Sequence, residues 1–238
     1  FGWVASSATA IMEMSAASGL AIVQDLNLNP FTASTLGTGI LIQSALTKGA
    51  RRILIGIGGS ATNDGGLGVA IALGYTFRKA GHAFTPTLET ILEADQVEKP
   101  ASLPVCELIV ACDVDNPLLG PRGATRVYGP QKGVTDFIWF EQRLAHLADL
   151  VRRDLGNDPR EAPGAGAAGG LGYGLMAFLG GRLVSGFDMV AKQIGLEARV
   201  VAEPGIGDGL AFAALDMVQQ QAEFRRGVGR RQFAQVRQ

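Results

Sequence analysis

Residues 53–66 read Ile-Leu-Ile-Gly-Ile-Gly-Gly-Ser-Ala-Thr-Asn-Asp-Gly-Gly, an apolar run that passes directly into a glycine-rich loop. The run at 53–57 is typical of a strand in a parallel sheet covered on both faces. Helical spacing follows from Leu67 to Leu73, so the loop joins a strand to the start of a helix. At such a junction, unpaired backbone N–H groups and the positive helix end favour a bound anion.

The residues before this stretch also predict a strand and a helix. The apolar segment from Thr9 to Met14 predicts a short strand. A helix is expected from Thr35 onward, since its apolar residues follow helical spacing: Leu36, Ile40, Leu41 and Leu46. Ser34 or Thr35 can cap its start, and Gly49 marks its end. Strand, helix and strand in this order predict a right-handed βαβ unit.

The residues after the loop extend the pattern. A strand is expected at 74–78, and a buried strand at 107–112 ends at Asp113, followed by a long loop through Gly133. Thr135 or Asp136 can cap a helix whose apolar residues follow helical spacing as far as Leu155. Asp149 and Arg153 are expected to form an ion pair on its outer side. Shorter helices are expected at 175–179 and from Ser185 or Gly186 to Ile194. The fold class is therefore α/β, with a mostly parallel sheet and flanking helices.

Composition narrows the class of protein. Of 238 residues, 47% are hydrophobic, 18% charged and 33 are glycine, which fits a loop-rich globular enzyme. The net charge of −1 gives no overall field for nucleic acid or an anionic membrane. Two cysteines cannot form a disulfide framework, so we expect a reducing, cytoplasmic location. We expect an α/β region at 1–202 and an atypical arginine- and glutamine-rich tail at 203–238.

The loop after the strand is the first candidate site. Its expected phosphate or substrate contacts are Gly58, Gly59, Ser60, Thr62, Asn63 and Gly65. Asp64 would repel a phosphate unless it holds Mg²⁺, takes a proton or binds a substrate hydroxyl. The alternative is that Asp64 only caps the following helix.

The same loop also fits the spacing of a dinucleotide motif. Gly56-x-Gly58-x-x-Ala61 matches it, and Arg78-Lys79 can receive the 2′-phosphate of NADP. A short glycine pattern is weak support, and Asp64 would face the pyrophosphate. An NADP-dependent oxidoreductase is therefore the alternative enzyme class, and a ligand-binding fragment without catalysis is a third hypothesis.

A second glycine-dense segment lies near the end of the region. Gly164, Gly166 and Gly169 either close over a ligand or form a tight turn onto the next helix. No strand precedes them, so a second dinucleotide motif is not expected. No Gly-Lys-Ser or Gly-Lys-Thr occurs, which excludes a P-loop nucleotide site.

A third candidate site follows the strand at 107–112. Asp113 would lie at the carboxyl end of a parallel strand, where it can carry Mg²⁺ or act as a base. Arg126 and Lys132 can neutralise the charge of a transferred phosphate. For Lys132 the alternative is an ordinary surface lysine. Cys112 is expected to be a small buried apolar residue rather than a nucleophile.

Several of these segments, taken in order, resemble the bacterial glycerate kinase family that makes 2-phosphoglycerate. The matching segments are 13–20, 37–39, 55–66, 111–114, 116–118, Gly129-Pro130-Gln131-Lys132-Gly133 and 163–170. The likeness covers about residues 1–200. It implies a two-domain α/β enzyme that uses ATP with Mg²⁺ as cosubstrate and D-glycerate as acceptor.

The resemblance also implies segments that this sequence lacks. Family members begin with Asp-Ser-Phe-Lys and Asp-Gly-Gly-Glu-Gly segments, expected before Phe1, and continue past the present end to a Thr-Gly-Glu-Gly segment. We therefore expect the chain to be a fragment with an incomplete fold, and to be inactive on its own.

Overall fold

A computed structural model describes residues 1–23 and 28–194 of the chain. The chain divides into two compact units, Phe1–Gly186 and Phe187–Gln238. Helix α7 (Gly186–Ile194) begins at the end of the first unit and matches the helix expected there. The expected tail at 203–238 and its boundary at residue 202 lie outside the described residues.

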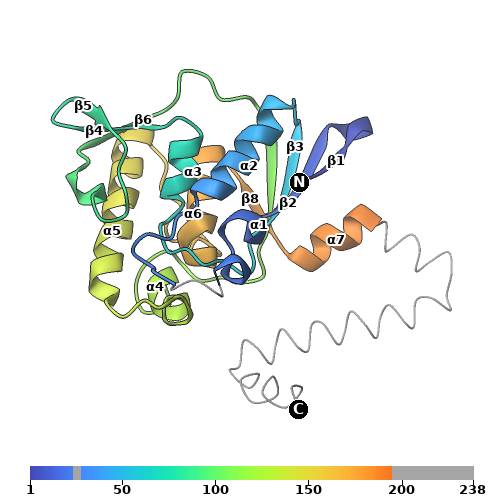
Figure 1. Cartoon of the computed structure of the whole chain (residues 1–238). Helices are drawn as coiled ribbons and strands as arrows, with labels where there is room; N and C mark the ends of the chain where they lie inside the picture. The colour runs from blue at the N-terminus through green and yellow to red at the C-terminus, as the bar shows by residue number, and fades with distance from the viewer. Residues whose placement is uncertain (24–27, 195–238) are drawn as a thin grey trace, which may run out of the picture. The chain divides into compact units, whose positions relative to one another are not determined.

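The first unit is built on a mixed sheet (Figure 1). Its strands lie in the order β1 (Gly2–Val4), β2 (Thr9–Glu13), β3 (Arg52–Gly56), β7 (Glu107–Ala111) and β8 (Arg182–Val184). The last four are parallel, and β1 pairs antiparallel to β2. This confirms the α/β class with a mostly parallel sheet. Strand β8 was not predicted.

The middle of the sheet is buried on both faces, as the apolar run predicts. In β3, the consecutive side chains of Ile53, Leu54 and Ile55 are all at most 2% exposed. Nearer the edge, Ile11 of β2 is 45% exposed although it pairs with Leu54. The burial of a strand therefore depends on its position in the sheet as well as on its own composition.

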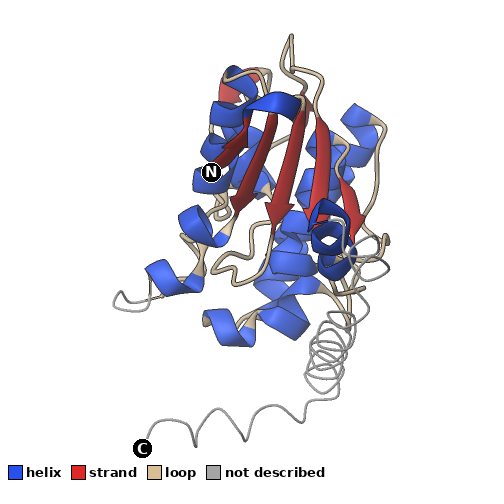
Figure 2. Cartoon of the chain, turned by 90° about the vertical axis from the view of Figure 1, so that its right-hand side faces the viewer, coloured by secondary structure: helices blue, strands red, loops and turns tan. Residues whose placement is uncertain are grey.

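Helices flank the sheet (Figure 2). They are α1 (Ser15–Ser18), α2 (Leu36–Thr47), α3 (Leu67–Ala72), α4 (Ala124–Tyr128), α5 (Phe137–Leu150) and α6 (Ala167–Leu179). Short 3₁₀ turns lie at Ala5–Ser7, Leu20–Ile22, Ile91–Glu93 and Pro130–Lys132. Helix α4 and the turn at Pro130–Lys132 fall within 113–133, where the sequence predicted only a loop.

Helix α2 has the expected bounds but a different buried face. Leu36 and Ile40 are 40% and 50% exposed. The buried face includes Gly39, where an added Cβ would lie 2.6 Å from the Cβ of Ala72 and 2.8 Å from the Cα of Val69 in α3. The missing side chain lets the two helices approach closely, and Ile42 and Leu46 share this buried face while Leu36 and Ile40 lie outside it.

Helix α5 confirms its predicted cap. The Asp136 carboxylate accepts a hydrogen bond of 2.9 Å from the Trp139 N–H. The predicted Asp149–Arg153 pair is wrong, because Asp149 pairs instead with Arg152 and Arg160. From Val151–Leu155 the helix continues as a π-helical turn, which changes the angular position of each later side chain.

The strand expected at 74–78 lies in a separate sheet. Strand β4 (Thr76–Lys79) pairs antiparallel with β5 (His82–Phe84) and β6 (Gln96–Glu98). Arg78 forms a salt bridge of 2.8 Å with Glu98 across this sheet. No helix among the described residues is long and apolar enough to cross a membrane.

Candidate functional site

The loop between β3 and α3 leaves the sheet at its carboxyl edge. Gly56 at the end of β3 is in register with Glu13 of β2 and Ala111 of β7. This is the edge at which open α/β sheets bind their ligands. Just beyond it, Gly58 and Gly59 are exposed. The structure thus places the first predicted loop at the expected edge.

The backbone at Gly58 and Gly59 is open to a ligand. The Gly59 carbonyl accepts a 2.9 Å hydrogen bond from Leu20 N–H, and Ala61 N–H donates one of 3.0 Å to Ser18. In contrast, the N–H groups of Gly58 and Gly59 donate to no acceptor within residues 1–23 and 28–194. A Cβ added at Gly58 would meet nothing within 4 Å. The loop is therefore anchored on one side and accessible on the other.

Thr62 and Asn63 lie deeper in the loop. Both are buried, and Asn63 Nδ2 donates a 3.0 Å hydrogen bond to Thr125 Oγ1 of α4. Thr62 Oγ1 and Asn63 Oδ1 are buried atoms that lack a hydrogen-bond partner in the described part of the chain. Such atoms are uncommon in folded proteins, so the interior of the loop retains hydrogen-bonding capacity.

Asp64 is enclosed rather than presented to a substrate. Its Oδ2 atom accepts hydrogen bonds from Thr35 N–H at 2.8 Å, Thr35 Oγ1 at 2.9 Å and Gly68 N–H at 3.3 Å, and Oδ1 accepts one of 3.1 Å from Gly66 N–H. Burial raises the pKa of the carboxyl, while these hydrogen bonds oppose the shift. The observed contacts are those of the capping alternative, shared between the starts of α2 and α3.

Ser34 or Thr35 was expected to cap α2 with its side chain. Ser34 Oγ accepts a 3.2 Å hydrogen bond from the N–H of Leu36, the first residue of the helix. Thr35 makes no such hydrogen bond, because its hydroxyl is directed to Asp64 and also accepts a 3.2 Å hydrogen bond from Val69 N–H. The two helix starts are therefore held by one polar cluster.

Lys132 is completely buried beneath the same loop. Its Nζ donates hydrogen bonds to Ser60 Oγ at 2.6 Å and to the Thr62 carbonyl oxygen at 2.7 Å. Burial lowers the pKa of Lys132 to about 7, and the charge of Asp64 acts in the opposite direction. The surface-lysine alternative is wrong, since the side chain joins two distant segments of the chain.

The second glycine cluster packs against the first. Gly164, Gly166 and Gly169 are buried. An added Cβ at Gly166 would collide with the Pro117 carbonyl oxygen, and one at Gly169 with the Thr62 carbonyl oxygen. Within α6, residues Ala168 to Gly170 have positive φ, which kinks the helix start at this contact. These contacts are those of the tight-turn alternative.

Asp113 and Arg126 lie on separate elements. Asp113 follows β7, is half-buried, and accepts a 2.9 Å hydrogen bond from Gly186 N–H through Oδ1. Arg126 of α4 is exposed, with its guanidinium 5.8 Å from the centre of the Phe137 ring, at a hollow of about 400 Å³. Across the described ranges, no three His, Cys, Asp or Glu side chains gather into a metal-binding group.

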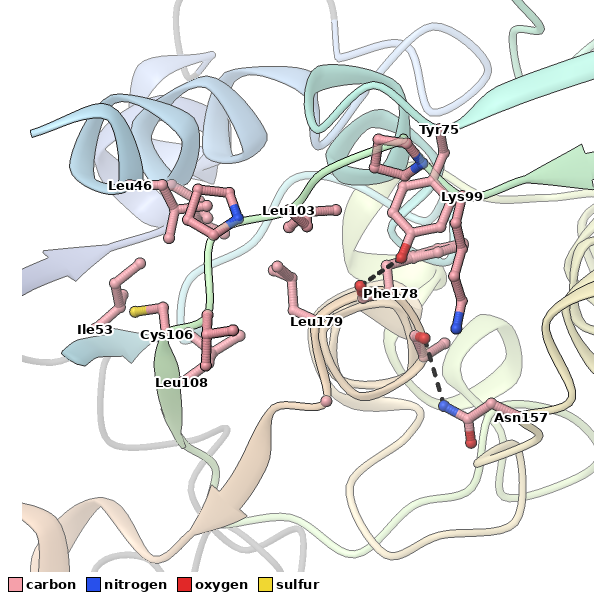
Figure 3. Close-up of a pocket in the computed structure, with 16 residues that line it drawn as sticks. Leu46, Ile53, Tyr75, Lys99, Leu103, Cys106, Leu108, Asn157, Phe178 and Leu179 are labelled. Carbon is pink, nitrogen blue, oxygen red and sulfur yellow. Dashed lines mark hydrogen bonds between the residues drawn. The ribbon is translucent and has the colours of Figure 1, made fainter. Parts of the chain in front are cut away.

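Another hollow lies at the opposite edge of the sheet, and Figure 3 shows the residues that line it. It has a volume of about 520 Å³ and includes Ile53 and Leu108, which lie near the amino ends of β3 and β7. Its walls are mostly apolar, with Lys99 and Asn157 as polar exceptions. This hollow was not predicted from the sequence, and none of the predicted site residues lines it.

Two residues at the carboxyl edge were missed as site candidates. Glu13 ends β2, and Ser15 Oγ donates a 3.3 Å hydrogen bond to its carboxylate. The Ser15 Cβ is 3.6 Å from the Cβ position of Gly59. Their place directly after a strand was the available signal.

The residues expected to bind the NADP phosphate are engaged elsewhere. Arg78 pairs with Glu98, and Lys79 Nζ lies 2.6 Å from Glu93. Both belong to the small antiparallel sheet, so the dinucleotide alternative loses the support of these two side chains.

Comparisons with known proteins agree on one family. The model of the glycerate kinase family matches residues 1–204. The glycerate kinase of Bacillus subtilis (strain 168) is 45% identical over 206 residues, covering 84% of this chain and 54% of that protein. The glycerate 2-kinase of Escherichia coli (strain K12) is 44% identical over 198 residues, covering 81% of this chain and 52% of that protein.

A solved structure supports the same assignment. A glycerate kinase 2 from Salmonella typhimurium LT2 superposes with a TM-score of 0.77 at 41% identity, covering 83% of this chain and 54% of that one. The chain thus spans about half the length of the relatives that it matches. By the extent of the family match and the agreement of sequence with fold, the chain belongs to the glycerate kinase family.

Proposed function

We propose that this chain carries part of the site at which a cytoplasmic enzyme transfers the γ-phosphoryl group of ATP to a hydroxyl of D-glycerate, giving 2-phosphoglycerate. Family membership supports the reaction class. The main structural support for the proposal is the exposed backbone of Gly58 and Gly59 at the carboxyl edge, with the buried ammonium group of Lys132 behind it. Phosphoryl transfer relies mainly on such positioning and charge stabilisation.

The loop binds anionic oxygen atoms of one substrate in this proposal. The N–H groups of Gly58 and Gly59 supply donors that find no acceptor among residues 1–23 and 28–194. Ser60 Oγ accepts a hydrogen bond from Lys132, which leaves its own hydroxyl hydrogen to be donated to a ligand. Arg126 adds positive charge from the exposed face of α4. The second glycine cluster supports the loop from its buried side, through Gly164, Gly166 and Gly169.

The residues at this edge fit a magnesium ion. Gly56 of β3 and Ala111 of β7 are register partners. Gly58 and Asp113 each follow two residues later, so both lie just beyond the same edge of the sheet. Carboxylate oxygen is the ligand that Mg²⁺ prefers, and such ions are commonly held by one or two carboxylates together with substrate phosphates. Asp113 would hold the ion, which would neutralise charge on the phosphates. Asp64, with its oxygens already occupied, orients the loop and the helix starts.

The proposal is tested by a chimera in which residues 1–204 replace the matching part of the Bacillus subtilis glycerate kinase. The chimera and the 238-residue chain are each incubated with ATP, Mg²⁺ and D-glycerate and followed by ³¹P NMR. We expect the chimera to form 2-phosphoglycerate, and Asp113→Asn in the chimera to abolish turnover while Asp115→Asn does not. A folded chimera that binds ATP without forming phosphoglycerate would favour the non-catalytic alternative. Oxidation of NADPH with a carbonyl acid would favour the oxidoreductase.

A further inference from the structure

We infer that Lys132 is a positioning residue, which holds the loop 58–62 in its anion-binding shape and whose buried charge is compensated by the bound anion. This inference rests on the proposed function and assigns the lysine a role through the loop rather than by contact with the transferred phosphate. The whole Lys132 side chain is inaccessible to solvent. A phosphate at the exposed glycines therefore does not reach the ammonium group directly.

The hydrogen bonds of Lys132 fix both ends of the loop's buried section. One goes to the side chain of Ser60 and the other to the backbone carbonyl of Thr62. On the opposite side, Leu20 N–H holds the Gly59 carbonyl. Because the C=O and N–H of a trans peptide point in opposite directions, this contact turns the Ser60 N–H away from Leu20. Lys132 and Leu20 together set the direction of the loop's donors.

The backbone that carries Lys132 is itself held in place. A Cβ added at Gly129 would collide with the Thr125 carbonyl oxygen, and Gly133 has a φ of 82°. Thr125 also accepts the hydrogen bond from Asn63 of the loop. The turn at Pro130–Lys132 and helix α4 therefore contact the loop as one support.

The electrostatic surroundings connect this support to anion binding. No carboxylate of the described residues forms an ion pair with Lys132. Asp64 is the ionisable group whose charge acts on the lysine, and its oxygens are occupied by hydrogen bonds of their own. A buried charge without an ion-pair partner is unfavourable. An anion on the outer side of the loop would compensate it, so anion binding and protonation of Lys132 should favour each other.

Sulfate is a suitable probe for this coupling, because it keeps its charge throughout the neutral range whereas phosphate titrates there. The ¹⁵N-labelled 238-residue chain is titrated with sulfate at about pH 6 and about pH 8.5, on either side of the lowered pKa of Lys132. We expect the amide signals of Gly58 and Gly59 to shift, with affinity about tenfold weaker at the higher pH. The Lys132 side-chain signal should show a pKa that rises when sulfate is bound.

Three variants complete the test. Lys132→Met should give weak binding at both pH values, Ser60→Ala should weaken binding yet keep its pH dependence, and Lys99→Met, at the far edge of the sheet, should match the wild type. Equal affinity in Lys132→Met and wild type, or a Lys132 pKa that sulfate does not move, would overturn the positioning role and leave the proposed function standing. Absence of any sulfate or ATP shift at Gly58 and Gly59 in the wild type would instead remove the proposed function. Should Lys132→Met not fold, the wild-type pH series decides.

Discussion

The backbone N–H of Gly65 donates a 3.1 Å hydrogen bond to the carbonyl oxygen of Gly169. The first glycine lies in the loop after β3 and the second in the kinked start of α6. Each would bring an added Cβ into close contact with its surroundings, with Leu144 at Gly65 and with Thr62 at Gly169. The two glycine clusters are therefore one interlocked structure, and their glycines are required by close approach as well as by backbone conformation.

Alanine substitutions at Gly156 and Gly169 separate the cost of the backbone conformation from the cost of the close approach. Gly156 and Gly169 have φ values of 68° and 69°, but nothing lies within 4 Å of a Cβ added at Gly156. We expect Gly156→Ala to reduce the free energy of unfolding by about 1–2 kcal/mol, from backbone strain alone. Gly169→Ala should reduce it by more than about 3 kcal/mol, because the methyl group also overlaps the Thr62 carbonyl. Urea unfolding measures both, and equal losses would contradict the interlocked packing.

Asp64→Asn should destabilise the fold although it changes only one atom. An amide NH₂ group would replace one carboxylate oxygen, while every partner of Asp64 is a donor. Leaving such buried groups unpaired lowers the free energy of unfolding by about 1–3 kcal/mol. The control is Asp115→Asn, since the Asp115 side chain is 75% exposed and its ion pair with Arg122 is long. A melting temperature that stays at the wild-type value for Asp64→Asn would show that the polar cluster is not needed for stability.

The protonation of Lys132 predicts how stability depends on pH. Its pKa is about 7 in the folded chain, against an ordinary value of 10.5. Between these values the unfolded chain binds more protons, so the free energy of unfolding should rise as the pH increases from about 7 to about 10. Below that range both states hold the proton and this contribution is constant.

Lys132→Met should lack this rise, whereas Lys99→Met should keep it. Chemical unfolding of the three proteins at several pH values checks the expectation. A rise of equal size in all three would assign the pH dependence to other groups.

Gly58→Ala tests the open side of the loop. Since nothing lies within 4 Å of the added Cβ, the free energy of unfolding should change by no more than about 1 kcal/mol. The methyl group would nevertheless occupy space beside the unused N–H groups, and sulfate affinity should fall at least about tenfold. Calorimetric titration with sulfate, alongside thermal melting, distinguishes the two effects. Wild-type affinity would place the anion elsewhere.

The strong periodic signals of the sequence were sufficient for the central elements. Strands β3 and β7 and helix α5 were predicted because long apolar patterns and a clear cap mark them. Strand β8 has only three residues, and α4 has five in a segment rich in proline and glycine. Such short elements are stabilised by neighbours distant in sequence, so local pattern carries little information about them.

The candidate site was predictable in position but less so in the role of each side chain. The loop at the carboxyl edge follows from the order of strand, glycines and helix. The burial of Lys132 does not, because its partners Ser60 and Thr62 precede it by 72 and 70 residues. Likewise, Asp64 accepts hydrogen bonds from five donors, the four described above and Ser34 Oγ at 3.5 Å. They come from two helix starts that only tertiary packing brings together.

The wide sequence separation of these supports also sets an order of folding. The loop 58–66 needs Thr35 before it, Lys132 after it, and finally Gly169. During synthesis from the amino terminus, the last support is made long after the loop itself, and contacts between distant segments close slowly. The anion-binding shape should therefore be one of the last parts of the first unit to form, and a nascent chain that ends before the second glycine cluster should have strands β1, β2, β3 and β7 but not its site.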